Sequence, residues 1–539
     1  MKPVVGDPPE TGSPPLPVSR LRGVERRSSV PLGLLVVGGL AGVAFYGLLA
    51  HGPGLSHDSM IYIDSARGIL RGDGVAVRGK PLTGSPPAYP WVLAGLAFAT
   101  SATPLQAARL LASILYGLNL VLICEAVRRA GAPRALVATT GLFFLSSAPI
   151  LTLHAMAWSE PLYLAVSTTG LILLARYLDA ARPSPGALVA SSLAVGLSPL
   201  TRYVGVALIP PTVVAILALQ DSPRRSRLRR AFLHLCLATA PLASWLGRNL
   251  VAANTATDRP LVLHPPNTSH VRRFVASLHD FFLPLPLSAW TKVGVVAAIL
   301  GGFAFASRDG LRRFPSNTTW LFLLYAASYV LVVVVALTFL DANVPVDFRI
   351  LSPALLALLV AGVSGTAKAS GPEDGAAART ATAALLLCAC ANVPWALSGA
   401  AALRHDGLEY GSVAWQRSEL LDRVRRMPPA SAVYSNGANV VRFFTGRMAL
   451  PIPPKASART GLVNQAYEAG VHEMIEECRS GRALIAYFDG IAWPGIIPSA
   501  REIESLARLP VLERVADGVI YGRPAPRPAL DPEPPTVRR

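Results

Sequence analysis

Charged side chains are scarce in this sequence. Asp, Glu, Lys and Arg make up 15% of its 539 residues, whereas a soluble globular protein carries about 25%. Hydrophobic residues account for 52% and gather in blocks of about 17 to 25 residues, the length that a helix needs to cross a bilayer. The shortage of charge argues against an ordinary soluble protein and indicates a chain that spans a membrane several times.

Cysteine is also rare, and its placement excludes two kinds of framework. Of the five cysteines, four lie in apolar runs, where a thiol packs as a small hydrophobe, and Cys478 stands alone near the C-terminus. The histidines are scattered, without the spacing of a zinc site. We therefore expect neither a disulfide scaffold nor a dedicated zinc centre.

Acidic residues are fewer than basic ones, 32 against 50, and the net charge is +18. On a soluble protein this balance would favour a nucleic-acid partner, but no aromatic residues are interleaved with the arginines. The arginines instead cluster in short segments between the apolar blocks, which the positive-inside rule places in the cytoplasm. These segments are residues 20–27, 128–134, 224–230 and 308–313.

With these basic segments inside, the apolar blocks predict about eleven transmembrane helices, with the N-terminus inside and the C-terminus outside. Two long outer loops are expected at 51–90 and 254–290, the first followed by a partly embedded segment at 91–99. The predicted spans are 31–50, 105–127, 135–153, 161–177, 187–200, 204–219, 231–250, 293–306, 320–340, 351–363 and 381–397.

The composition changes near residue 398, where the apolar runs shorten to strand length. Strands are expected at 431–435 and 483–488, with helices at 440–444 and 466–478, a pattern typical of a small α/β domain. The predicted fold is a polytopic α-helical membrane protein (31–397) with a C-terminal extracytoplasmic α/β domain (398–522). Cytoplasmic residues 1–30 and the Pro-rich tail 523–539 are expected to be disordered.

Asp58 stands at the outer end of the first predicted span, where a carboxylate indicates a functional site. If residues 57–67 are helical, Tyr62 shares the face of Asp58, whereas Asp64 does not and is free to pair with Arg67. One interpretation makes Asp58 a general base, and the other makes it the N-cap of that helix.

Four more predicted outer ends carry charge. Glu160 precedes a proline at the start of a span and is read either as an acceptor or metal contact or as a favourable charge at a helix N-terminus. Arg202 with Tyr203, Arg248 and Arg349 lie at other outer ends. An arginine there can hold a phosphate or anchor its helix at the interface.

The first predicted outer loop resembles that of the glycosyltransferase C superfamily, membrane enzymes that use polyprenyl-phosphate sugars. Similar groups are the protein mannosyltransferases, the aminoarabinose transferase and the lipopolysaccharide galacturonosyltransferases. Two departures are that Ser59 stands where many relatives have Glu, and Ser85 where several have a phosphate-binding Lys. The resemblance is carried by Asp58, Tyr62, Arg67, Gly72 and the Pro-Pro-Ala-Tyr-Pro run that contains Tyr89.

The resemblance implies an inverting glycosyltransferase in the inner (plasma) membrane, with a polyprenyl-phosphate sugar as donor and a glycan, lipid or protein as acceptor. Asp58 would be the catalytic base, and a divalent cation (Mg or Mn) bound by Asp58 and Glu160 is an open alternative. A transporter or flippase of lipid-linked glycans is the rival class. The implied substrate-binding residues are Tyr62, Asp64, Arg67, Arg78, Lys80, Tyr89, Glu160, Arg202, Tyr203, Arg248 and Arg349.

Overall fold

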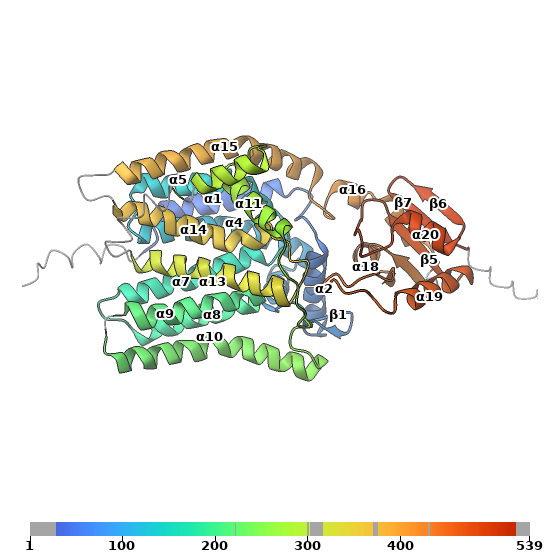
Figure 1. The fold of residues 1–539 in the computed structure, drawn as a ribbon, viewed down its shortest axis with the longest axis horizontal. Coiled ribbons are helices and arrows are strands. Elements are labelled where there is room, and N and C mark those ends of the chain that lie inside the picture. Colours follow the sequence, from blue (N-terminus) through green and yellow to red (C-terminus); the bar gives the residue numbers. More distant parts are fainter. Residues whose placement is uncertain are drawn as a thin grey trace, which may run out of the picture.

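The computed structural model describes residues 29–220, 222–298, 301, 316–369, 376–428 and 432–523. The basic segments 20–27 and 308–313 lie outside these ranges. So do the two tails that were predicted to be disordered, except for residues 29, 30 and 523 at their inner ends. Within the ranges the chain forms a bundle of long helices and, beyond it, a smaller region that contains a sheet (Figure 1).

The bundle is built from apolar helices that run roughly parallel or antiparallel to one another (Figure 1). A helix satisfies its own backbone hydrogen bonds, which is why apolar segments of this length fold in this way. One continuous hydrophobic core joins most of them. The helices are α1 (Leu32–Leu48), α4 (Pro104–Arg129), α5 (Arg134–Ser146), α6 (Ala148–Ala155), α7 (Glu160–Asp179), α8 (Pro185–Thr201), α9 (Ile209–Leu219), α10 (Arg224–Ala253), α13 (Asn317–Phe339), α14 (Phe348–Ala369) and α15 (Ala376–Asp406).

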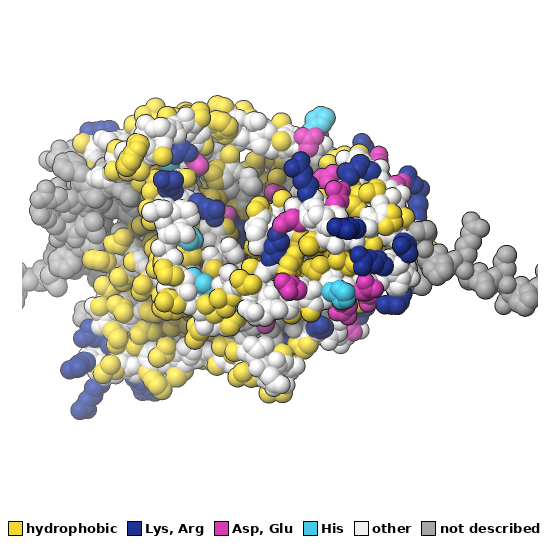
Figure 2. Space-filling view, turned by 45° about the vertical axis from the view of Figure 1, so that its right-hand side comes forward, with side chains coloured by type: hydrophobic (Ala, Val, Ile, Leu, Met, Phe, Trp, Pro, Cys, Tyr) yellow, Lys and Arg dark blue, Asp and Glu magenta, His cyan; other side chains and the backbone are white. Residues whose placement is uncertain are grey.

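By length and composition, five helices in the described part of the chain can each cross a membrane, and α5 with α6 makes a sixth if that bent pair is one span. Shorter apolar helices occupy several other predicted spans, including Leu32–Leu48, Pro185–Thr201 and Tyr203–Leu219. The chain is a multi-pass membrane protein. Apolar side chains cover the flank of the bundle, while charged side chains gather over the C-terminal region and at the far end of the bundle (Figure 2).

Two predicted spans are less regular than the sequence indicated. The span at 135–153 is broken, because α5 and α6 meet at an angle of 60°. Ser147 is extended there, and Pro149 cannot donate the backbone hydrogen bond that would continue α5. The span at 204–219 begins as a 3₁₀ turn, η3 (Tyr203–Leu208), because the prolines that open α9 lack the same donors.

Other segments predicted as loops are helical. Residues 224–230 form the first turns of α10 rather than a basic loop, since arginine is a good helix former. The outer loop at 254–290 contains α11 (Thr268–Phe282), which is capped by Asn267. The segment expected to be partly embedded at 91–99 belongs to α3 (Ala88–Thr100).

The first outer loop folds into a helix and a hairpin before it re-enters the bundle. Helix α2 (His57–Arg71) ends at Gly72, whose φ of 88° lies in the left-handed region that favours glycine. The strands β1 (Ala76–Val77) and β2 (Lys80–Pro81) then pair antiparallel. Figure 1 shows α2 across the end of the bundle that faces the C-terminal region.

The C-terminal region is a five-stranded mixed sheet in the order β4-β3-β5-β7-β6. Strand β3 runs parallel to β4 and β5, whereas β7 runs antiparallel to β5 and β6. Separate apolar clusters cover its two faces. Its elements are α16 (Val413–Gln416), α17 (Glu419–Arg426), β3 (Ala432–Ser435), α18 (Ala438–Thr445), β4 (Ala449–Pro451), α19 (Tyr467–Arg479), β5 (Ala483–Phe488), α20 (Ala500–Ala507), β6 (Val511–Val515) and β7 (Gly518–Gly522).

These elements lie close to the positions that the sequence indicated. Strand β5 has the bounds of the strand expected at 483–488, and β3 covers the described part of the strand expected at 431–435. All six residues of β5 are buried, as expected for a central strand covered on both faces. Helix α18 packs on α2, so the C-terminal region lies directly against the first outer loop.

Candidate functional site

The segment that leads into α2 is held against the connection between α6 and α7. The Gly54 amide donates to the Ala155 carbonyl (2.8 Å), and the Ala157 amide donates to the Gly54 carbonyl (2.9 Å). A Cβ at Gly54 would lie 2.3 Å from Sδ of Met156 and 3.0 Å from Cβ of Leu408, so a larger residue would require these side chains to shift. The contact fixes the start of α2 beside the residues that precede α7.

Ser56 and Trp158 extend this contact to the helix cap. The Ser56 hydroxyl is the N-cap of α2 and accepts from the Ser59 amide at 3.4 Å. The Trp158 indole N–H donates to the same hydroxyl at 2.8 Å. The interpretation of Asp58 as the N-cap is therefore wrong, because Ser56 has that role and leaves the Asp58 carboxylate for another partner.

Four charged side chains form a continuous chain at this point. The Asp58 carboxylate lies 2.6 Å from Nη2 of Arg349. Nε of Arg349 is in turn ion-paired with Glu160, and Nη1 of Arg202 lies 2.5 Å from the same glutamate oxygen. The four residues come from α2, α7, the end of α8 and the start of α14, all predicted as outer ends of spans.

The two carboxylates of this chain differ in exposure. The Glu160 side chain is 1% exposed and the Asp58 side chain 41%. Burial of Asp58 acts to raise its pKa, but the Arg349 guanidinium, together with His57 and Arg202, outweighs this and holds the pKa of Asp58 below its ordinary value. Asp58 is thus an ionised carboxylate with an open side, whereas Glu160 is enclosed between two guanidinium groups.

Aromatic and hydroxyl side chains complete the surroundings. The Arg349 guanidinium lies over the Trp158 ring, 4.3 Å from its centroid. The Ser159 hydroxyl accepts from Nη1 of Arg202 at 3.3 Å and lies 3.4 Å from the Tyr62 hydroxyl. As predicted, Tyr62 lies on the same side of α2 as Asp58, and its buried ring meets the edge of Tyr89.

The donor set does not fit a divalent cation in this arrangement. Two carboxylates are available, and a guanidinium already lies between them, so a cation bridging Asp58 and Glu160 would have to replace Arg349. Mg²⁺ can be held by one or two carboxylates with water among its ligands, so it is the position of the Arg349 guanidinium, and not the number of carboxylates, that disfavours a cation here. Among the described residues, no group of three or more His, Cys, Asp or Glu is placed to hold a metal ion.

Tyr203 and Arg248 were predicted to bind substrate, but their side chains hold the first outer loop. The Tyr203 hydroxyl donates to the Thr83 carbonyl at 2.7 Å. Nη2 of Arg248 donates to the Val75 carbonyl at 3.1 Å, and its guanidinium stacks on Trp245. Tyr203 of η3 is thus joined to the residue two positions after β2, and Arg248 of α10 to the residue just before β1. A substrate contact of either residue stays a prediction.

The remaining predicted residues lie on the side of α2 that faces the C-terminal region. Asp64 and Arg67 form the expected ion pair at 2.8 Å, and Arg67 also covers the Phe443 ring of α18. Arg78 lines a small cleft with Asp64 and α18, and Lys80 is exposed on β2. The structure therefore places Arg78 and Lys80, both predicted to bind substrate, in the hairpin rather than in the charged chain.

Sequence reasoning assigned no role to Ser56, Trp158 or Ser159. Trp158 and Ser159 directly precede Glu160, so their place in that short motif was the available signal. His57 was also given no role, although its ring is hydrogen-bonded to Asn439 of α18 at 2.7 Å. That contact brings the C-terminal region to the residue next to Asp58.

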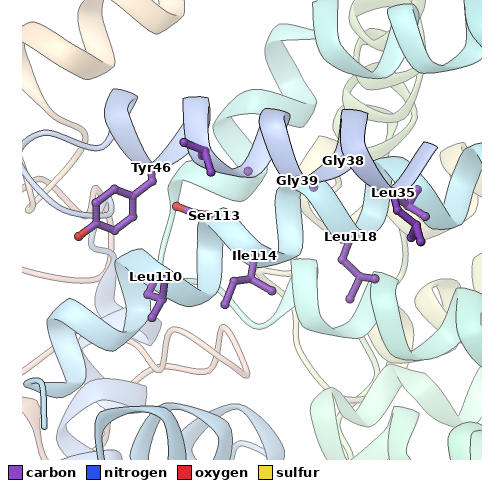
Figure 3. Close-up of a pocket in the computed structure, with 12 residues that line it drawn as sticks. Leu35, Gly38, Gly39, Tyr46, Leu110, Ser113, Ile114 and Leu118 are labelled. Atoms are coloured by element: carbon purple, nitrogen blue, oxygen red, sulfur yellow. The ribbon is translucent and has the colours of Figure 1, made fainter. Parts of the chain in front are cut away.

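A separate groove lies on the flank of the bundle between α1 and α4 (Figure 3). Its floor is formed where Gly38 and Gly42 approach Gly117 closely. Its walls are aliphatic side chains such as Leu35, Ile114 and Leu118, which Figure 3 labels. The groove contains no ionisable side chain for chemistry other than the Tyr46 phenol, so the charged chain remains the candidate site.

Comparison with known proteins agrees with a membrane transferase fold. The family model described as dolichyl-phosphate-mannose-protein mannosyltransferase matches residues 84–246, which include Glu160 and Arg202. Asp58 and Arg349 lie outside the matched segment. No curated protein sequence matches the chain.

Three solved structures share the fold at low identity. ArnT from Cupriavidus metallidurans, bound to undecaprenyl phosphate, has a TM-score of 0.56 at 16% identity, covering 91% of this chain and 98% of that one. The arabinofuranosyltransferase AftD from Mycobacteria gives 0.52 at 14%, covering 93% and 40%. The Archaeoglobus fulgidus oligosaccharyltransferase gives 0.51 at 12%, covering 84% and 68%. At these identities the likeness concerns the fold.

Proposed function

We propose that this chain, which has the fold of the glycosyltransferase C superfamily, transfers a sugar from a polyprenyl-phosphate donor to an acceptor hydroxyl. The observation that carries the proposal is the chain of charges formed by Asp58, Arg349, Glu160 and Arg202. It combines a carboxylate with an open side and two guanidinium groups held in place by a buried glutamate. Base and anion-binding groups side by side are what the transfer requires.

In the proposed reaction, Asp58 accepts the proton of the acceptor hydroxyl while its oxygen attacks the anomeric carbon. The bond from that carbon to the phosphate oxygen breaks, and polyprenyl phosphate leaves as an anion. Attack opposite the leaving group inverts the configuration at the anomeric carbon. The partial exposure of Asp58 supports this role, because the acceptor must reach its carboxylate.

Arg202 and Arg349 are the proposed ligands of the donor phosphate. Glu160 fixes both guanidinium groups before substrate binds, so little rearrangement is needed when negative charge develops on the leaving group. Arginine is suited to this task because its planar fork can bind two phosphate oxygens. No step of the proposed reaction uses a divalent cation, because the Arg349 guanidinium lies between the carboxylates of Asp58 and Glu160.

The donor is proposed to enter from the bilayer, with its polyprenyl chain among lipids and its phosphate at the outer end of the bundle. One protein of the same fold was solved with undecaprenyl phosphate bound, and the family model is described by a dolichyl-phosphate sugar. Both favour a lipid-linked donor. The acceptor is a glycan, lipid or protein hydroxyl that lies between α2 and the C-terminal region.

The proposed orientation places the charged chain and the C-terminal region outside the inner (plasma) membrane. The arginines at the start of α10 lie at the opposite end of the bundle, which the positive-inside rule assigns to the cytoplasm. A cysteine introduced at exposed Glu468 of α19 should react with an impermeant reagent in cells. One at Ser226 should react only after permeabilisation, and the reverse pattern would overturn this orientation.

The decisive experiment supplies the purified protein with polyprenyl-phosphate sugars and a membrane lipid extract. Transfer predicts free polyprenyl phosphate and a glycosylated product, and the Asp58→Asn variant should form neither above background. A transporter or flippase would move the donor intact and release no polyprenyl phosphate. If the donor is relocated but never cleaved, the proposed transferase function is wrong.

A further inference from the structure

Arg349 has two carboxylate partners, and they differ in how firmly they are enclosed. Its Nε atom faces Glu160, which is 1% exposed, whereas its Nη2 atom lies 2.6 Å from Asp58, which is 41% exposed. A guanidinium presents its five N–H donors in a rigid plane. One edge of that plane is therefore held inside the protein, and the other edge points to a carboxylate with an open side.

The plane itself is held by one further contact, with a ring that is fixed in turn. The Trp158 ring lies under the guanidinium at 4.3 Å, and Trp158 is fixed by its hydrogen bond to Ser56. Arg202, the other phosphate candidate, is already bonded through one Nη atom to both Glu160 and Ser159. The Nη2 edge of Arg349 points to the carboxylate with the open side, so an anion that binds Arg349 at this edge takes the place that Asp58 now holds.

We infer that the donor phosphate and Asp58 compete for the Nη2 edge of Arg349, so that donor binding releases the Asp58 carboxylate to act on the acceptor. The inference rests on the proposed function and adds an order to it. Before the donor binds, the Asp58 carboxylate is engaged in its ion pair with Arg349. Once phosphate oxygens take its place on Arg349, Asp58 is free to accept a proton, and the phosphate is already held for departure.

If Asp58 and the phosphate compete for Arg349, removal of the Asp58 carboxylate should tighten donor binding, although it removes the catalytic base. Equilibrium binding of undecaprenyl phosphate would be measured on the detergent-purified full chain and on Asp58→Asn. The Asn variant should bind about two- to fivefold more tightly, the contribution expected of a partly exposed ion pair. Equal or weaker binding by Asp58→Asn would overturn the inference.

Asp73→Asn is the matched control. Asp73 follows the other end of α2 and is also paired with an arginine, Arg71, at 3.0 Å, but it lies outside the charged chain. Its replacement removes the same charge and should leave the affinity for undecaprenyl phosphate unchanged. A similar gain in both variants would mean that net charge, and not competition for Arg349, sets the affinity.

A second comparison separates competition from simple repulsion between Asp58 and phosphate. In an Arg349→Gln background, removal of Asp58 should no longer tighten binding, because the shared partner is gone. An equal gain in both backgrounds would reject the inference, because the gain would then not depend on the shared partner.

The outcomes also distinguish this inference from the proposed function. If the unmodified protein does not bind undecaprenyl phosphate, the lipid-phosphate donor itself is wrong and the inference falls with it. If the unmodified protein binds and cleaves the donor, the transferase function stands. If Asp58→Asn and Asp73→Asn then bind undecaprenyl phosphate with the same affinity, only the competition is rejected.

Discussion

Each end of the helical bundle contains a glutamate buried between two arginines, but the two clusters are built differently. Glu125, near the end of α4, is 3% exposed and lies 2.7 Å from both Arg128 and Arg129. Its partners are three and four positions along the same helix, so the cluster forms wherever α4 is helical. Arg128 also donates to the Ser29 carbonyl ahead of α1, which anchors two helix ends to each other.

Glu160 has the same chemistry with partners from distant parts of the chain. Arg202 follows α8 and Arg349 opens α14, so this cluster exists only when three helices have packed. It also includes the partly exposed carboxylate of Asp58, which is paired with Arg349. A buried glutamate between two arginines is therefore not by itself a sign of function. The Glu160 cluster is the candidate site because it joins distant segments of the chain and ends in a carboxylate with an open side.

The largest expected effect concerns the stability of the two clusters. Glu160→Gln leaves two guanidinium groups without their shared anion, and breaking a buried ion pair costs about 3–5 kcal/mol. Glu125→Gln should cost less, because its arginines lie along one helix end and can extend to the membrane surface. Thermal unfolding of both variants in detergent would measure this, and equal losses would contradict the distinction.

The next effect separates chemistry from stability. Asp58→Asn keeps the size of the side chain and removes its basicity, so sugar transfer should fall by about 10² or more. Glu125→Gln is the control, since the fraction that folds should retain its turnover. Initial rates with a polyprenyl-phosphate sugar would measure both variants. Near-normal turnover of Asp58→Asn would remove Asp58 from the reaction.

A smaller effect is expected from the arginines one at a time. Arg202→Ala or Arg349→Ala should each weaken binding of a polyprenyl-phosphate analogue by about 1.5–3 kcal/mol, the worth of a charge-assisted hydrogen bond. Replacement by Lys should weaken it less, because the charge remains and only the fork is lost.

Arg248→Ala provides the control for those two variants. Arg248 also lies at a predicted outer end, but its guanidinium serves the Val75 carbonyl and the Trp245 ring. It should lower stability by about 1 kcal/mol without changing the affinity for the analogue. If Arg248→Ala weakens binding as much as Arg349→Ala, the predicted substrate contact of Arg248 is supported instead.

Much of the fold was accessible from the sequence, because apolar length and helix formation are local properties. The superfamily resemblance is confirmed, and most predicted spans coincide with helices. The break between α5 and α6 and the 3₁₀ turn at Tyr203 were missed, although prolines mark both places. A proline shows that a helix is interrupted, but the direction of the chain after it depends on what the next segment packs against.

For the site, the sequence provided the members but not their pairing. Asp58, Glu160, Arg202 and Arg349 were predicted one by one as ionisable residues at outer ends of spans. That Arg349 would lie between the two carboxylates depends on how α14 packs beside α7, which no local pattern encodes. Arg248 shows the same limit, because the sequence left open whether it binds substrate or anchors its helix, and its contacts with the Val75 carbonyl and the Trp245 ring appear only in the folded chain.

The smallest expected effect concerns the ionisation of Asp58. Arg349 holds the pKa of Asp58 below its ordinary value, against the raising effect of burial. Because transfer requires the ionised carboxylate, the acid limb of the pH profile for kcat/KM, which reports the free enzyme, should lie below the ordinary range of an aspartate carboxyl. The Asp58–Arg349 attraction stabilises the fold above the unfolded pKa and is lost as pH falls through the folded one.

Arg349→Gln tests this assignment. Without the guanidinium, burial is the dominant influence on Asp58, so its pKa should rise and the acid limb of kcat/KM should move to higher pH. Glu125→Gln should leave the limb in place, because that cluster lies at the other end of the bundle. Because Arg349→Gln should also lower the rate, the comparison uses the pH at the midpoint of the acid limb and not the maximum value of kcat/KM. If the limb does not move, the ion pair with Arg349 does not set the ionisation of Asp58, and the group that titrates in the free enzyme is a different one.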